Sequence, residues 1–326
     1  SGGLVGSEMC IRDSNYSQSR GYSHVYKYNP DGRSYSDANT SLMMVQLNHF
    51  LNEKMFYDIK YSITDNNYGS YVFEDYDSYE VIKEDGIYQG VYRFEGDTVY
   101  NYVNDKYMTA FGTGFFTGGQ DKGYTKRATV SRNFKTTFNW QATNAHSIKA
   151  GVSATFYDLQ NTYHTIRNAY AGTELESNNY KPIVLPDSTV YSDMYSVEPK
   201  EASFFLQDKF ERDEIVINFG LRYDTFDANT YYPSQRRNPI NASTYYLKNI
   251  DGTDSLDSNG NLVVDTQRMS EPIDSKVASQ LSPRFGFAYQ LGNVAVLHFS
   301  YGHFFQMPPM YAISVSYTHL TLPTSS

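Results

Sequence analysis

The stretch MFYDIKYSITD, residues 55–65, decides the fold class because apolar and polar side chains alternate along its whole length. Successive residues of a β-strand point to opposite sides. The first face would carry Met55, Tyr57, Ile59, Tyr61 and Ile63, and the second would carry Phe56, Asp58, Lys60, Ser62 and Thr64. We therefore predict a strand with one apolar and one polar face.

The same alternation recurs on both sides of short turns. Before residues 52–54, one face would carry Met43, Val45, Leu47 and Leu51. Three similar pairs of alternating segments follow, at residues 128–138 with 148–156, 202–210 with 215–223, and 285–291 with 297–301. The sequence thus predicts about eight strands in four hairpins.

The turn of the last hairpin requires separate treatment. Gly292 and Asn293 suggest a two-residue turn, but that turn would place the apolar residues of the two strands on opposite faces. We therefore predict one extra residue in the connection, formed as a three-residue loop or a glycine bulge. Tyr289 should then pair with Leu297.

The connections between hairpins are long, at about residues 66–123, 161–199 and 227–281. Irregular connections of this length are uncommon in compact domains. Soluble β-sandwiches and propellers also alternate, but they usually have shorter, regularly spaced turns. Outer-membrane barrels combine short periplasmic turns with long extracellular loops. We predict an all-β, antiparallel, up-and-down transmembrane barrel with aromatic girdle positions at Tyr57, Tyr61, Tyr223, Tyr289 and Tyr301.

The composition fits this prediction. Aromatic residues make up 16% of the chain, with 32 Tyr and 20 Phe, and charged residues make up 19%. This balance argues against disorder. No apolar run approaches the roughly 18 to 20 residues of a membrane-spanning helix, and a mean hydropathy of −0.56 is compatible with strands that are half lumenal. Because the formal charge is −9, we expect no nucleic-acid partner.

The two ends of the chain differ from the rest. SGGLVGSEMCIRDS, residues 1–14, and VSYTHLTLPTSS, residues 315–326, resemble translated sequencing adapters. We expect both to be artefacts, so that residues 15–314 form a partial outer-membrane barrel. The single cysteine, Cys10, lies in the first of them. We therefore expect no disulfide and no cysteine-ligated metal.

Two stretches carry a family resemblance. They are FLQDKFERDEIVINFGLRYDTFDAN, residues 205–229, and SPRFGFAYQLGNVAVLHFSYGHFFQMPPMY, residues 282–311. They resemble the barrel of TonB-dependent receptors, particularly the group with a carboxypeptidase-regulatory-like N-terminal domain. The resemblance implies a barrel of about 22 strands in the outer membrane of a Gram-negative bacterium. It also implies a plug domain, absent from this chain, through which the TonB complex would act.

The partners that this resemblance implies are outer-membrane lipid, the TonB complex and a scarce ligand. That ligand could be a siderophore, cobalamin, a saccharide or a peptide. A passive porin or an adhesin-type barrel is the alternative, and a plug domain upstream would distinguish the two. In either case Arg222 and Asp224 should face the lumen, because they alternate with Leu221 and Tyr223.

The sequence contains no recognisable catalytic site. Neither a nucleophile elbow, a phosphate-binding loop nor a dinucleotide fingerprint is present. The histidines of residues 15–314 show no metal-ligand spacing. A barrel hydrolase would need Ser, His and an acid from different strands, which no motif indicates. We expect no enzyme activity, no cofactor and no metal.

Two loops are candidates for ligand binding. YVFEDYDSYEVIKEDG, residues 71–86, interleaves tyrosine with carboxylate, which suits a sugar or a cation, although an exposed loop can have this composition without a ligand. Its candidate contacts are Tyr71, Glu74, Tyr76, Asp77 and Tyr79. DGTDSLDSNGN, residues 251–261, is rich in oxygen ligands. Aligned as a calcium loop it begins at Ser255 and ends at Thr266, without the anchoring carboxylates, so a solvated turn is favoured.

Overall fold

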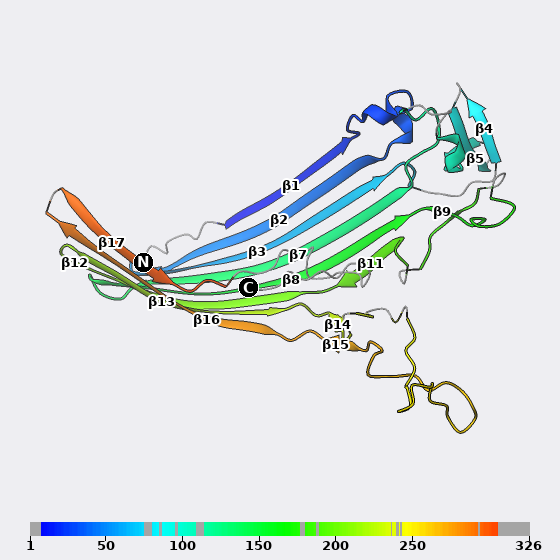
Figure 1. Ribbon diagram of the computed structural model, residues 1–326. Helices are drawn as coiled ribbons and strands as arrows, with labels where there is room; N and C mark the ends of the chain where they lie inside the picture. The colour runs from blue at the N-terminus through cyan, green and yellow to red at the C-terminus, as the bar shows by residue number, and fades with distance from the viewer. Residues whose placement is uncertain are drawn as a thin grey trace.

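The chain folds around one curved antiparallel sheet (Figure 1). The computed structural model describes residues 8–74, 80–84, 87–94, 97–108, 114–176, 180–186, 189–235, 237–238, 241, 243–292 and 294–305. The strand order is β1-β2-β3-β7-β8-β12-β13-β16-β17, and β11 also pairs with β8, which makes 10 strands. Within the described residues, β1 and β17 form the two edges of the sheet. The predicted up-and-down antiparallel architecture is confirmed.

Four long hairpins build this sheet, as predicted. They are β2 and β3 (Tyr35–Asn52, Met55–Tyr71), β7 and β8 (Gly123–Gln141, His146–Thr165), β12 and β13 (Lys200–Arg212, Ile215–Asp227), and β16 and β17 (Ala278–Leu291, Ala295–Gly302). In the last hairpin Tyr289 lies opposite Leu297, so residues 292–294 form the connection. The predicted extra residue is confirmed, although Asn293 itself lies outside the described residues.

The register brings most apolar residues of the four hairpins to one side, with exceptions such as Phe56 and Phe205 on the other. Ile59 of β3 lies opposite Leu47 of β2 and Thr136 of β7. The same row continues across the sheet through Val152, Phe204 and Tyr223. We call the side that carries Ile59 the outer face and the side that carries Lys60 the inner face. The five tyrosines predicted for the girdles all fall on the outer face.

The long connections lie at one end of the sheet and the short turns at the other (Figure 1). The connections are not irregular throughout, which corrects the sequence-based expectation. They hold a three-stranded sheet of β4 (Glu80–Glu84), β5 (Ile87–Phe94) and β6 (Asp97–Asn101). They also hold two ribbons, β9 with β10 (Arg167–Asn168, Pro182–Ile183) and β14 with β15 (Tyr231–Pro233, Pro272–Asp274). Most of these strands are too short to show period-two alternation.

The remaining elements belong to the same end. β11 (Ser192–Val197) pairs with the end of β8 and continues the line of β12. Three 3-10 turns lie in the connections: η1 (His24–Tyr26), η2 (Pro30–Gly32) and η3 (Asp105–Tyr107). The cluster of buried apolar residues is here as well, formed by Tyr71, Val72, Tyr102, Tyr124 and Ile166. Among the described residues, no helix has the length and hydropathy needed to cross a membrane.

The edge strand β1 (Glu8–Ser19) includes residues 8–14 of the opening segment. Its pairing with β2 places Arg12 opposite Met43 and Cys10 opposite Val45 on the outer face, while Ile11 falls on the inner face. This distribution of polar and apolar residues is the reverse of that in the other strands. Backbone pairing along a free edge needs no particular side chains, so the artefactual origin of residues 1–14 stays a prediction. Residues 315–326 lie outside the described part of the chain.

Candidate functional site

The inner face is the polar wall of the sheet. On β3 and β7 it carries Lys60 and Lys135, which lie directly opposite each other. Lys149 of β8 lies opposite Gln207 of β12. Arg284 of β16 lies opposite Gly220 of β13 and Gly302 of β17. We call Lys60, Lys135, Lys149 and Arg284 the inner-face cations.

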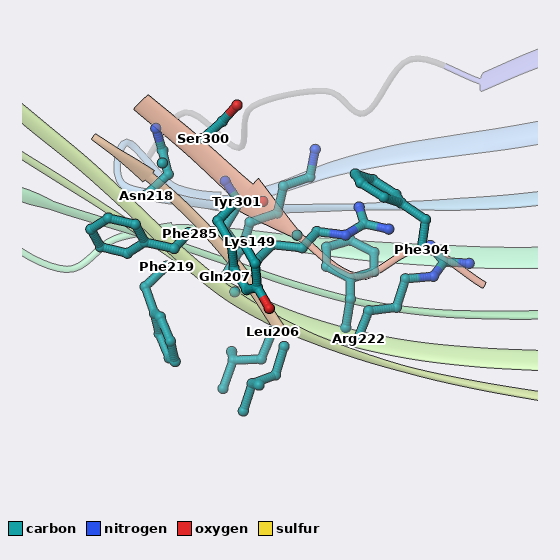
Figure 2. Close-up of a pocket in the computed structure, with 16 residues that line it drawn as sticks. Lys149, Leu206, Gln207, Asn218, Phe219, Arg222, Phe285, Ser300, Tyr301 and Phe304 are labelled. Atoms are coloured by element: carbon teal, nitrogen blue, oxygen red, sulfur yellow. The ribbon is translucent and has the colours of Figure 1, made fainter. Parts of the chain in front are cut away.

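Arg284 lies between two glycines of the neighbouring strands. Neither Gly220 nor Gly302 has a side chain, and a Cβ on Gly302 would lie 3.4 Å from the Phe304 ring and 3.5 Å from the Arg284 Cγ, so these two side chains cover that glycine. The Arg284 guanidinium carbon lies 5.1 Å from the centre of the Phe304 ring, a cation–π contact. Figure 2 shows Phe304 and Ser300 on one side of the sheet, with Leu206 and Phe219 pointing to the other. The hollow around Arg284 is thus lined by residues of both faces, and only those on the inner face can share a ligand.

Arg222 and Asp224 lie on the inner face, as predicted. The Arg222 Nε donates to both carboxylate oxygens of Asp224, at 2.8 and 3.0 Å. Lys209 is likewise paired with Glu211, at 2.5 Å. These pairs neutralise their charges within the wall. They contrast with the inner-face cations, none of which forms an ion pair with a described residue.

A second group of polar residues surrounds the buried cluster at the loop end. Lys122 is buried, and its Nζ lies 3.1 Å from the Asp105 carboxylate and 5.5 Å from the centre of the Tyr180 ring. Burial lowers the pKa of Lys122, while Asp105 acts in the opposite direction. Burial also raises the pKa of Tyr26, in η1, to about 12, and the nearby Asp121 adds to this effect. At the loop end, the buried Lys122 charge is thus paired with Asp105.

The structure divides the residues predicted to contact a ligand. Tyr71 is the last residue of β3 and is only 5% exposed, packed edge-on against Tyr35 and stacked on Tyr124. Glu74 is exposed and its carboxylate lies 2.7 Å from the Lys126 Nζ. Tyr76, Asp77 and Tyr79 lie outside the described residues. Ligand contact in this loop stays a prediction, and the described geometry gives Tyr71 a packing role.

The acidic loop of residues 251–261 uses its carboxylates internally. Asp257 accepts hydrogen bonds from the backbone N–H groups of Asn259 and Asn261, both at 2.8 Å. Asp254 pairs with Lys248 at 2.5 Å. The backbone bonds lower the pKa of Asp257, after the fashion of an Asx turn. No cluster of three or more potential metal ligands occurs in the described part of the chain.

The inner-face cations were not recognised as a group from the sequence. Alternation in residues 55–65 places Lys60 on the polar face of its strand, but nothing in the sequence singles out the other three. Each of the four cations falls on the face opposite the apolar residues of its own strand. This alternation is the only signal of them in the sequence. Their arrangement across the sheet follows from the register of several strands.

A family model described as an outer membrane beta barrel domain matches residues 8–324. The chain belongs to this family. The outer-membrane barrel therefore lies in the Gram-negative outer membrane, with its outer face toward lipid and its inner face toward the lumen. Barrels of this family are typically transport proteins without enzyme activity. No curated protein sequence matches the chain significantly.

Several solved structures are similar to part of the chain at low identity. The ferric citrate transporter FecA is 8% identical with a TM-score of 0.39, over 82% of this chain and 28% of that one. The ferric-catecholate import receptor Fiu from E. coli K12 is 11% identical with a TM-score of 0.38, over 82% and 33%. The CymD monoaromatic hydrocarbon channel is 11% identical with a TM-score of 0.27, over 93% and 75%. The chain thus spans about a third or less of FecA and Fiu.

Proposed function

We propose that the parent protein is an outer-membrane receptor and active transporter that captures a scarce ligand at its loop end. The observation that carries the proposal is the asymmetry of the sheet. Every long connection lies at one end (Figure 1) and contains short paired strands, and two of these connections contribute to a buried cluster. A passive pore has less need than a ligand-capturing receptor of such folded connections. The resemblance of residues 205–229 and 282–311 to TonB-dependent receptors points the same way.

In this proposal the chain contributes part of the barrel wall and its loops. The energy for uptake comes from the TonB complex, which does not act on these residues directly. A plug domain encoded upstream would fill the lumen and contact the TonB complex. The ligand would be a siderophore, cobalamin, a saccharide or a peptide. The residues of this chain would bind and guide the ligand without chemical change, since the inner face shows ion pairs and isolated cations in place of an assembled nucleophile and base.

The experiment uses the complete gene. Its sequence upstream of residue 15 should encode a plug domain, and the full-length protein should be retained on the immobilised periplasmic domain of TonB. A barrel without the plug, made by deleting that upstream segment, is the matched control and should not be retained. A signal peptide followed directly by a barrel strand would refute the proposal and favour a passive porin or an adhesin.

A further inference from the structure

The inner-face cations differ from Lys209 and Arg222 because they lack acidic partners. Lys209 and Arg222 each have a carboxylate within ion-pair distance. No described carboxylate lies within that distance of the inner-face cations. Three of them, Lys135, Lys149 and Arg284, are exposed. Their charge is therefore directed at whatever occupies the lumen.

The pair Lys60 and Lys135 shows that this charge is uncompensated within the wall. The two lysines lie directly opposite each other, an arrangement that destabilises antiparallel strands. Their next neighbours in the row, Gln46 and Ser153, are neutral. Asp58 is the adjacent inner-face residue of β3, yet it forms no ion pair with either lysine. An anion held between the two ammonium groups would turn the repulsion into attraction.

Neutral hydrogen-bond donors lie beside the other two cations. Gln207 lies opposite Lys149, and Asn218 and Ser300 flank the hollow near Arg284 (Figure 2). Amide and hydroxyl donors alternating with lysine and arginine suit carboxylate and phosphate oxygens. The Phe304 ring packs against the Arg284 guanidinium, and no side chain of the adjacent strands lies directly opposite Arg284, because its partners there are Gly220 and Gly302.

We propose that the inner-face cations bind a soluble ligand that carries several carboxylate or phosphate groups. This inference rests on the proposed function and names the charge class of the ligand that enters the lumen. Lys135 lies opposite Ser153, four residues along β8 from Lys149, which separates the two lysines by about 14 Å. A single small anion cannot contact both, so a ligand with several anionic groups is favoured. Binding should weaken as salt rises, because the groups are solvated and screened.

The test measures binding to the full-length protein in detergent. Inorganic tripolyphosphate and citrate serve as phosphate and carboxylate probes in isothermal titration calorimetry at low ionic strength. At least one of them should bind, and the double variant Lys135→Gln/Lys149→Gln should lower that affinity at least tenfold. Lys209→Gln is the matched control, because it removes an inner-face charge already paired with Glu211. A heat-modifiability gel verifies that each variant is folded.

Three outcomes would overturn the inference. They are a wild type that binds neither probe, equal affinity in the wild type and the double variant, and an equal loss in Lys209→Gln. A double variant that loses thermal stability but keeps its anion affinity would also overturn it, and would assign the cations to an acidic protein surface such as a plug. None of these readouts needs TonB or energised uptake. The receptor proposal therefore stands or falls separately.

Discussion

Replacing Ile59 with arginine tests the assignment of the outer face. Ile59 lies at the centre of the apolar segment of β3, between Leu47 and Thr136 of the neighbouring strands. An arginine on the lipid face near the bilayer midplane costs about 2–4 kcal/mol. A cost of about 2.7 kcal/mol lowers the folded-to-unfolded ratio by roughly 100-fold. Ile59→Arg should therefore impair assembly of the parent barrel severely.

A depth series on the same strand makes this prediction quantitative. Ile63 also points outward, but it lies opposite Arg132 and next to the outward-facing Asp65, where the apolar segment ends. Near the interface the cost falls to about 0–1 kcal/mol, so Ile63→Arg should be tolerated. Lys60→Gln, on the inner face, should change stability little.

The assay is reversible urea unfolding of the refolded full-length protein in lipid vesicles, with heat modifiability on gels as the measure of folding. The expected order of destabilisation is Ile59→Arg far above Ile63→Arg, with Lys60→Gln least affected. Equal costs for Ile59→Arg and Lys60→Gln would refute the assignment of faces. Equal costs for the two arginine variants would refute the position of the membrane boundary.

Three further predictions concern packing and charge, and urea unfolding of the parent protein measures the first two. A Cβ at Gly151 would lie 2.5 Å from the Phe205 ring, so Gly151→Ala should cost about 1–3 kcal/mol; Phe205→Ala should recover part of that loss, and no recovery would show that the contact is unimportant. Asp105→Ala leaves the buried Lys122 ammonium without its carboxylate and should cost roughly 1 kcal/mol; adding Lys122→Met should restore stability, and an unchanged double variant would contradict this account. The pKa of Tyr26 is about 12 when folded and 10.0 in its ordinary state, so its contribution to stability is present below pH 10 and lost as pH rises toward 12; Tyr26→Phe should reduce the loss of thermal stability in that window, and an unaltered pH profile would argue against it.

The hairpins could be predicted because the outer face must be apolar at every strand that crosses lipid. In β3 this requirement gives alternation from Met55 to Ile63. It also settled the last hairpin, where only pairing of Tyr289 with Leu297 keeps both apolar faces on one side. Where a strand crosses lipid, its outer face must be apolar. The sequence therefore predicts both the strand and its register there.

The pattern disappears where the strands leave the lipid. β3 continues to Tyr71, but its outward residues there include Asp65, Asn67 and Gly69. Backbone pairing with β2 and β7 holds this part of the strand, and side-chain polarity no longer distinguishes the faces. The sequence-based prediction therefore ends this strand too early and treats Tyr71 as a loop residue available to a ligand.

The inner-face cations illustrate a second limit. Lys60 and Lys135 are separated by a long connection, and their direct opposition depends on the register between β3 and β7. The position of Arg284 between two glycines likewise depends on β13 and β17. Alternation along one strand shows on which face a residue lies. The residues opposite it in neighbouring strands follow only from the assembled fold.

The most direct test of the transmembrane barrel is a spin-label scan along residues 55–65 of the full-length protein in lipid vesicles. Single cysteines would be introduced after replacing any cysteine of the full-length protein; residues 15–314 contain none. Labels at odd positions from 55 to 63 should be accessible to dissolved oxygen and shielded from a water-soluble nickel chelate. Labels at even positions should report the lumen, without contact with lipid. Accessibility without a two-residue period, or chelate access at Ile59 equal to that at Lys60, would contradict the account.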